Sequence, residues 1–199
     1  MPVAGRVVTG YSKPKIADYA CTAGVISYSN GMTLARGVSV EISVDEGDSN
    51  NFYADNQLAE SDSGAFTSGT ATLTVDGLKA NAEKSIQGLP TADTDGFLNY
   101  NDDQNKGYKG IGYITRYQSD GVVTFVPTII VKTKFNQLSR SAQTQEERKN
   151  YQTQQLTARI HRGDDAKHTW LKVSETEYET EAAAEAALNA ALGITNVGG

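Results

Sequence analysis

The side chains that could support catalysis or metal binding are few. The chain has two histidines, His161 and His168, and one cysteine, Cys21. The histidines flank a turn signal and could meet across a hairpin, but a zinc site uses three or four protein ligands and no third one is evident nearby. Cys21 has no adjacent histidine or basic residue that would stabilise a thiolate. We interpret the histidines as surface strand residues and the cysteine as a small packed side chain.

One acidic loop weakly resembles a calcium site. Asp93, Asp95 and Gly96 precede Asp102 and Asp103, but the spacing lacks the bidentate glutamate that closes a calcium-binding loop. The chain also lacks the Gly-x-Ser-x-Gly turn of serine hydrolases and the glycine-rich phosphate loop of nucleotide-binding proteins. We therefore expect no enzymatic activity, no cofactor and no metal site.

The informative pattern is the distribution of charge. No lysine or arginine occurs from Gly37 to Leu78, whereas basic residues concentrate later in the chain. The acidic candidates for an inter-subunit contact or a lumen wall are Glu41, Asp45, Glu46, Asp48, Asp55, Glu60 and Asp62. The complementary basic candidates are Lys132, Lys134, Arg140, Arg148 and Arg159. Three interpretations stay open: a solvated acidic face, complementarity between copies that steers assembly, or a wall that repels a passing polyanion.

Alternating residues predict the strands that would position these charges. Apolar and polar residues alternate over residues 38–45 and again over residues 70–75, with period two, as in half-buried strands. We predict one long antiparallel hairpin over residues 37–75, with a turn at Asp55-Asn56 and a distal part that projects from the body. An earlier hairpin is predicted at Asn30-Gly31, because both residues tolerate positive φ.

The remaining elements complete a single domain over residues 1–199. We predict an N-terminal arm over residues 1–20, a helix over residues 78–87 that Asp76 caps and Gly88 ends, and a hairpin that turns at Asp120-Gly121. A polar linker spans residues 136–150, and a C-terminal helix and tail occupy residues 176–199. Antiparallel hairpins dominate, so the expected fold is mainly β: an antiparallel sandwich or barrel with one flanking helix and a short C-terminal helix.

Composition narrows the function classes further. The formal net charge is −6, whereas nucleic-acid binders normally carry a basic surplus, so we expect no tight DNA binding. A single cysteine permits no intrachain disulfide, which suits a reducing cytoplasm. The sequence contains no apolar run long enough to span a membrane, and residues 1–6 lack the apolar segment of a secretory signal. We expect a protein made in the cytoplasm, with no membrane partner.

Four segments carry a family resemblance. They are residues 40–44 (VEISV), 52–62 (FYADNQLAESD), 69–78 (GTATLTVDGL) and 150–156 (NYQTQQL). This pattern resembles the major tail protein (tail tube protein) family of long-tailed phages of Gram-positive bacteria.

The resemblance implies a β-sandwich subunit that forms hexameric rings. The rings would stack into a tube whose acidic lumen lets double-stranded DNA pass without tight binding, and loops and arms would bridge to the next ring. The implied partners are further copies of the chain and the tape-measure, tail-tip and tail-terminator proteins, and the implied location is the virion tail after assembly in the host cytoplasm. The alternatives are a surface adhesion or carbohydrate-binding β-sandwich, a hydrolase on a β-scaffold, and the tube protein of a contractile machine.

Overall fold

The protein is described by a computed structural model that covers residues 5–47, 50–54, 57–62, 65–90, 96–141, 144 and 152–194. Strands account for most of its regular structure. They are β1 (Val7–Thr22), β2 (Val25–Thr33), β3 (Gly37–Glu46), β4 (Asn50–Ala54), β5 (Gln57–Asp62), β6 (Phe66–Val75), β7 (Lys109–Ser119), β8 (Val122–Phe135), β9 (Gln154–His161) and β10 (Leu171–Val173). The helices are α1 (Ala80–Gln87) and α2 (Glu181–Ala191).

Eight of these strands form one antiparallel sheet. The order across it is β2-β1-β7-β8-β9-β6-β3, and the short β10 pairs with β8 beside β9. The expected mainly β, antiparallel fold with flanking helices is therefore confirmed. The finer expectation of a sandwich or barrel is not, because the sheet remains open at its two edge strands, β2 and β3.

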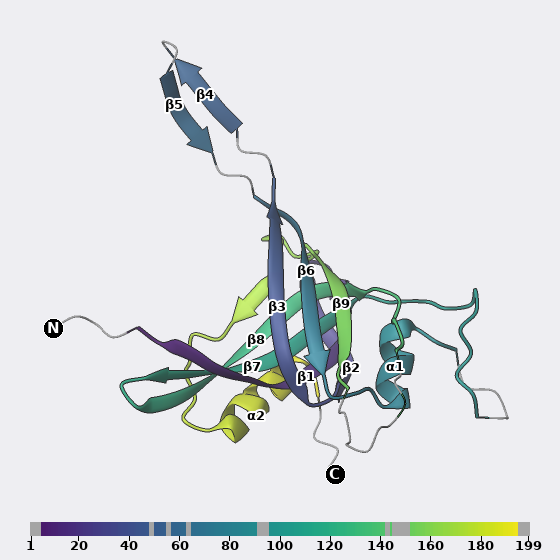
Figure 1. Cartoon of the computed structure of the whole chain (residues 1–199). Helices are drawn as coiled ribbons and strands as arrows, with labels where there is room; N and C mark the ends of the chain where they lie inside the picture. Colours follow the sequence, from purple (N-terminus) through teal and green to yellow (C-terminus); the bar gives the residue numbers. More distant parts are fainter. Residues whose placement is uncertain are drawn as a thin grey trace.

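The open sheet turns one face onto itself and so forms the main core. In Figure 1, β3, β6 and β9 cross in front of β1, β7 and β8 at a steep angle. Both halves contribute fully buried residues to one apolar cluster, which includes Leu73 and Leu156 from the first half and Ile111 from the second. Helix α1 adds Ala82 and Ile86 to the same cluster. The alternation seen in the sequence thus buries the apolar set of β6 and β9 and leaves their polar set outside.

Helix α2 covers the opposite face of the sheet at β7 and β8. Leu188 and Leu192 are fully buried there against Ile114 and Ile129. The close approach depends on Gly112 of β7, where a Cβ atom would lie 2.6 Å from Leu192 Cδ1. Thr180 caps the helix, since its hydroxyl accepts a hydrogen bond from the Ala183 amide. The predicted C-terminal helix is therefore confirmed.

Two expectations about the N-terminal region are wrong. Residues 7–20, assigned to an N-terminal arm, lie within β1, which pairs with β2 and β7 inside the sheet. The predicted Asn30-Gly31 turn is instead part of β2, and the chain reverses at Ala23-Gly24, both with positive φ. Asn30 also has positive φ, but it lies where the β1–β2 register shifts. The permissive dipeptide therefore forms a bulge and not a turn.

The expected cap of helix α1 is also wrong. The helix begins at Ala80 after Lys79, which makes no side-chain capping bond. The Asp76 carboxylate instead accepts hydrogen bonds from the Arg36 amide (3.0 Å) and the Arg36 guanidinium (2.8 Å). It thereby ties the end of β6 to the connection between β2 and β3. The expected stop is confirmed, because Gly88 adopts the left-handed conformation at the C-terminus.

The long hairpin is confirmed, and its distal part stands away from the body. Strand β3 pairs with β6 from Gly37↔Val75 to Glu46↔Phe66. Strands β4 and β5 form a separate two-stranded sheet, which projects well beyond the rest of the molecule (Figure 1). The turn predicted at Asp55-Asn56 lies outside the described residues. The Asp120-Gly121 turn joins β7 and β8 as expected, with positive φ at both residues.

Truncation of Leu188 tests how α2 is held. Leu188→Ala removes a fully buried side chain, and such changes cost about 2–5 kcal/mol of unfolding free energy. Chemical denaturation followed by circular dichroism measures this. The control is Val25→Ala in β2, where the side chain is 68% exposed, and we expect a loss below about 0.5 kcal/mol there. Equal losses in both variants would contradict the packing described for α2.

Candidate assembly surface

One face of the sheet lies open to solvent and is strongly polar. The inward residues of β6, such as Leu73, are fully buried, whereas Thr70, Thr72 and Thr74 point to the other face and are partly exposed. In Figure 1 no helix lies over this outer face of β3, β6 and β9. The second helix, α2, packs elsewhere, on β7 and β8. We call the outer face of β3, β6, β9 and the adjoining end of β8 the open face.

The strand register places charge across the open face in a defined order. One row runs from Ser43 on β3 through Thr70 on β6 and Arg159 on β9 to Lys134 on β8. Acidic residues lie toward the β3 edge, and basic residues lie toward β8. The neutral Ser and Thr side chains of β6 separate the two sets. The open face therefore carries a lateral charge gradient.

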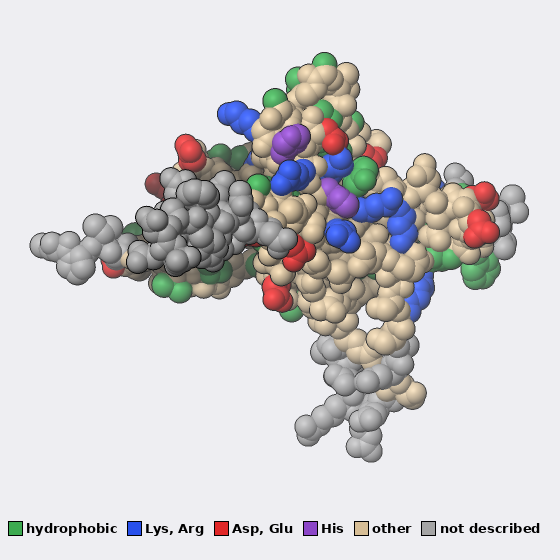
Figure 2. Space-filling view, turned by 90° about the horizontal axis from the view of Figure 1, so that it is seen from above, with side chains coloured by type: hydrophobic (Ala, Val, Ile, Leu, Met, Phe, Trp, Pro, Cys, Tyr) green, Lys and Arg blue, Asp and Glu red, His purple; other side chains and the backbone are tan. Residues whose placement is uncertain are grey.

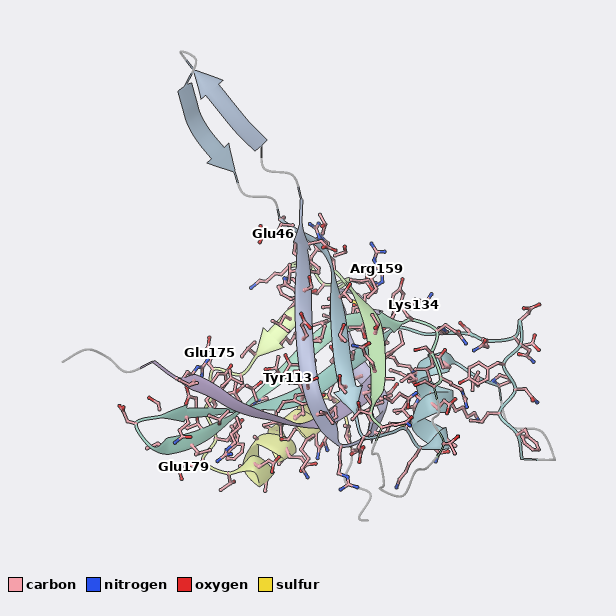
Figure 3. All side chains as sticks on the ribbon, in the orientation of Figure 1. Glu46, Tyr113, Lys134, Arg159, Glu175 and Glu179 are labelled. Carbon is pink, nitrogen blue, oxygen red and sulfur yellow. The ribbon has the colours of Figure 1, made fainter. Side chains whose placement is uncertain are left out.

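The acidic candidates lie on the hairpin, as the sequence predicted. Glu41, Asp45 and Glu46 are exposed on β3, and Figure 3 labels Glu46 at the end of β3, where the chain leaves for β4. Among the described residues, no cation forms an ion pair with any of the three; Asp45 accepts a hydrogen bond from the Ser68 hydroxyl (3.0 Å).

The other acidic candidates are only partly described. Glu60 and Asp62 belong to β5, of which the structure describes the backbone pairing. Asp48 and Asp55 lie outside the described residues. Their position relative to the open face therefore stays a prediction.

Three of the basic candidates come together at the far end of β8 and β9. Lys134 lies opposite Arg159, and Lys132 lies opposite His161, so all four side chains share the open face. Figure 2, seen from the side to which the hairpin points, shows lysine, arginine and histidine side chains gathered there. Figure 3 labels Lys134 and Arg159 close together. We define the basic patch as Tyr108, Lys132, Lys134, Arg159 and His161.

An aromatic ring holds part of the basic patch in place. The Lys132 ammonium lies 4.4 Å from the centre of the Tyr108 ring, and Lys134 lies 5.7 Å from it. The His161 ring meets the same tyrosine edge-on at 5.4 Å. Such contacts between cations and aromatic faces are favourable. Tyr108 is 39% exposed, so the ring is open to a partner.

Burial and neighbouring groups shift two pKa values in this region. Partial burial, and then the nearby Lys132, Arg159 and Lys134, lower the pKa of His161 below its ordinary value of 6.5. The Lys132 ammonium donates to both carboxylate oxygens of Asp164, at 2.7 and 2.8 Å, and lowers the pKa of Asp164. Lys132 is thus neutralised within the chain. In the described part of the chain, Lys134, Arg159 and Arg162 have no carboxylate at ion-pair distance.

One basic candidate lies away from the patch, and another lies outside the described residues. Arg140 forms an ion pair with Glu83 of α1 and lies 5.4 Å from the centre of the Tyr100 ring. It therefore fastens the segment after β8 to helix α1. Arg148 lies outside the described residues, as does most of the predicted linker over residues 136–150.

The sequence did not single out Tyr108, Asp164 or Tyr19 as functional. Asp164 follows the turn after β9, and the Tyr19 hydroxyl, from β1, lies 3.1 Å from the Asp164 carboxylate. Tyr108 lies in a glycine-rich basic loop between Lys106 and Lys109. The one sequence feature that could have pointed to Tyr108 is an aromatic residue between two lysines. Its proximity to β8 depends on the β1–β7–β8 pairing, which sequence patterns do not specify.

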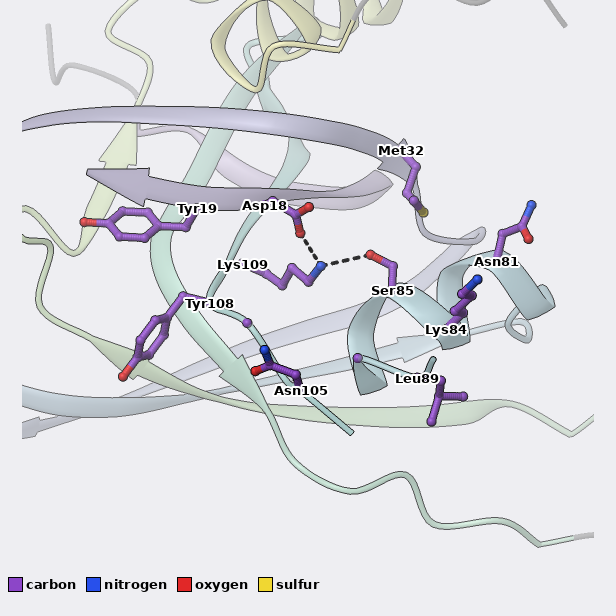
Figure 4. Close-up of a pocket in the computed structure, with 12 residues that line it drawn as sticks. Asp18, Tyr19, Met32, Asn81, Lys84, Ser85, Leu89, Asn105, Tyr108 and Lys109 are labelled. Carbon is purple, nitrogen blue, oxygen red and sulfur yellow. Dashed lines mark hydrogen bonds and ion pairs between the residues drawn. The ribbon is translucent and has the colours of Figure 1, made fainter. Parts of the chain in front are cut away.

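A cavity of about 600 Å³ lies beside the basic patch, between α1 and β1. Figure 4 shows Lys109 at its centre, contacting Asp18 and Ser85. Lys109 is 6% exposed and donates to the Ser85 hydroxyl at 3.0 Å. Both contacts of the ammonium join elements of the fold, since Asp18 is on β1 and Ser85 is on α1. The ion pair thus links β7 to β1, and the hydrogen bond to Ser85 fastens α1 to the same point of the sheet.

The described residues contain no group of three His, Cys, Asp or Glu side chains that could hold a metal ion. No helix in the described part of the chain is long and apolar enough to cross a membrane.

The chain was also compared with known proteins. It matches no protein-family model and no curated protein sequence.

The environment of His161 leads to a testable pH dependence. Its lowered pKa means that the unfolded state binds the proton more tightly, so the folded state loses stability as pH falls below about 6.5. NMR titration of the histidine should give a midpoint below 6.5. Removing nearby charge with Lys134→Gln and Arg159→Gln should raise that midpoint, whereas Arg116→Gln, on exposed β7 surface, should leave it unchanged. An unaltered midpoint in the double variant would contradict the described patch.

Proposed function

We propose that this chain is the tail tube subunit of a long-tailed bacteriophage, a structural protein without enzymatic activity. Copies form closed, hexameric rings, and rings stack into a tube in the virion. The tube is assembled in the host cytoplasm with tape-measure, tail-tip and tail-terminator proteins. Double-stranded DNA passes through the lumen during ejection without tight binding.

The observation that carries the proposal is the projecting β4–β5 hairpin. Within the described residues its two strands pair with each other and with no other strand, and a lone two-stranded hairpin is marginally stable in water. Such an element gains stability by contact with a neighbour. The most distinctive part of the sequence resemblance, residues 53–60 (YADNQLAE), falls in the same region.

The edges of the main sheet support the same proposal. Strand β3 spans ten residues and pairs on one side with β6, so in the part of the chain that the structure describes its other side offers unpaired backbone groups. A long edge strand invites pairing with another chain unless it is protected. A closed ring supplies such pairing, because each copy uses the edge of the next.

The polarity of the open face suits an aqueous lumen. Its Thr and Ser side chains need no apolar cover, and Glu41 and Asp45 add negative charge near the β3 edge. Negative charge repels the phosphate backbone of DNA. The basic patch lies at the other side of this face, so lumen lining is proposed for the β3 and β6 side.

Electron microscopy of the purified protein tests the proposal directly. Negative-stain images across a range of protein and salt concentrations should show six-fold rings or hollow tubes. A protein that stays monomeric at all concentrations and binds glycans would overturn the proposal in favour of the carbohydrate-binding alternative.

Shortening the hairpin separates assembly from folding. The Gly47 amide donates to the Ala65 carbonyl, so replacing residues 48–64 by Asn-Gly gives β3 and β6 a compatible tight turn. We expect the melting temperature to change by less than about 4 °C, because no main-sheet pairing is lost. Rings and tubes should be absent in micrographs of this variant. Tubes as abundant as those of the unaltered chain would contradict a role for the hairpin.

A further inference from the structure

Three cations that lack a carboxylate partner gather at the end of β8. Lys134 and Arg159 are exposed and lie opposite each other on β8 and β9 (Figure 3), which places their Cβ atoms about 5 Å apart. Lys106 lies beside them. Its ammonium donates to the neutral Gln137 side chain at 2.7 Å, and partial burial and then the charge of Lys134 lower its pKa. Within the described residues, none of the three cations has a carboxylate at ion-pair distance, so the fold leaves this positive charge uncompensated.

The surroundings of these cations confine an anion to one side of the basic patch. Lys132 is already paired with Asp164, so the patch is neutralised on that side. Toward the acidic edge strand β3, the neutral Thr70 of β6 lies next to Arg159 and separates it from the carboxylates. An anion that reaches the patch from solvent therefore meets Lys134 and Arg159 together.

The chemistry of this pair suits a phosphate group better than a carboxylate. A guanidinium that binds a carboxylate forms two parallel hydrogen bonds, which use both carboxylate oxygens. A phosphate has further acceptor oxygens, so one phosphate can accept from the Arg159 guanidinium and the Lys134 ammonium at once. Lys134 is restrained for this contact, because its ammonium lies 5.7 Å from the centre of the Tyr108 ring. A strand of linked phosphates also brings a second negative charge toward Lys106.

We propose that this side of the basic patch binds phosphate groups, and that its ligand is a phosphodiester strand of nucleic acid. One phosphate contacts Lys134 and Arg159, and a neighbouring phosphate contacts Lys106. The contact is weak and independent of base sequence, because it involves the backbone of the strand alone. The inference goes beyond the proposed function and needs no ring, since a single copy carries all three cations. The site also lies apart from the β3 and β6 surface proposed for the lumen.

Two measurements on the unaltered protein test the contact. Fluorescence anisotropy of a labelled oligothymidylate of ten nucleotides gives its Kd, at protein concentrations where sedimentation shows a monomer. Each phosphate contact to a single strand contributes about −0.7 to the slope of log K against log salt, so three cations should give a slope of about −2. NMR titration should also show a higher midpoint for His161 when the strand is bound, because a phosphate beside the imidazole favours its charged form.

A pair of matched variants locates the contact. Lys134→Gln with Arg159→Gln should weaken binding by about tenfold or more and reduce the salt slope to about −0.7, since one of three phosphate contacts remains. The control, Arg116→Gln with Lys172→Gln, removes the same charge at exposed positions on β7 and β10. It should bind the strand within about twofold of the unaltered protein. Circular dichroism should show that both variants are folded.

Two further probes identify the chemistry of the ligand. Inorganic phosphate should raise the His161 midpoint in the unaltered protein and leave it unchanged in the Lys134→Gln, Arg159→Gln variant. A peptide of ten glutamates should bind at least about tenfold more weakly than the oligonucleotide. A response to inorganic phosphate without binding of the oligonucleotide would overturn the assignment of a nucleic-acid strand. Equal binding of the peptide would overturn the preference for phosphate.

Three other results would overturn the proposal as a whole. They are a salt slope near zero, a His161 midpoint that neither phosphate probe moves, and equal weakening of binding in the control variant. The salt slope and the midpoint are measured on the unaltered protein, so they decide the matter even if the double variant does not fold.

The outcome is separable from that of the proposed function. The binding measurements use the monomer, whereas the tail tube proposal depends on rings and tubes in micrographs. Tubes from a chain that does not bind the oligonucleotide would refute the phosphate contact alone. Binding by a chain that never forms rings or tubes would support the contact and refute the tube.

Discussion

Burial of one sheet face against itself holds the molecule in shape. The sheet turns near the junction of β8 and β9, and leucine and isoleucine side chains from its two halves then share one core. With that face enclosed, the outer face of β3, β6 and β9 has no apolar residues left to cover. The same turn keeps β2 and β3 at open edges. Both the polar open face and the unpaired edge strand therefore follow from a single packing arrangement.

Much of this fold could be predicted from local sequence. Alternation in β3, β6 and β9 gave the strands, and the paired positive-φ residues Asp120-Gly121 gave the β7–β8 turn. The wrong predictions concern residues that can form either of two local structures. Asn30-Gly31 suits a tight turn or a bulge equally well, and the choice falls to the bulge because β1 continues beside it. Asp76 suits a helix cap, yet Arg36 offers its carboxylate two hydrogen bonds.

The charged surface was predictable in part. The lack of Lys and Arg in the hairpin can be read from the sequence, and so can the basic residues that follow. Which of these basic residues lie together cannot be read from it. Lys134 and Arg159 are neighbours only through the β8–β9 register, whereas Arg140 pairs with Glu83 on α1. Which cations remain unpaired depends on tertiary neighbours such as Asp164. The sequence therefore indicated the sign of the charge in each segment, and the fold determined which basic residues lie together.

Strand β6 has a further consequence for cooperativity. It continues directly from the projecting hairpin at one end and pairs with β9, which carries Arg159, along its length. A contact that restrains the hairpin therefore also restrains β6 and, through the β6–β9 ladder, the strand that carries Arg159. By thermodynamic linkage, a contact at Arg159 that stabilises this ladder would favour binding at the hairpin by the same free energy.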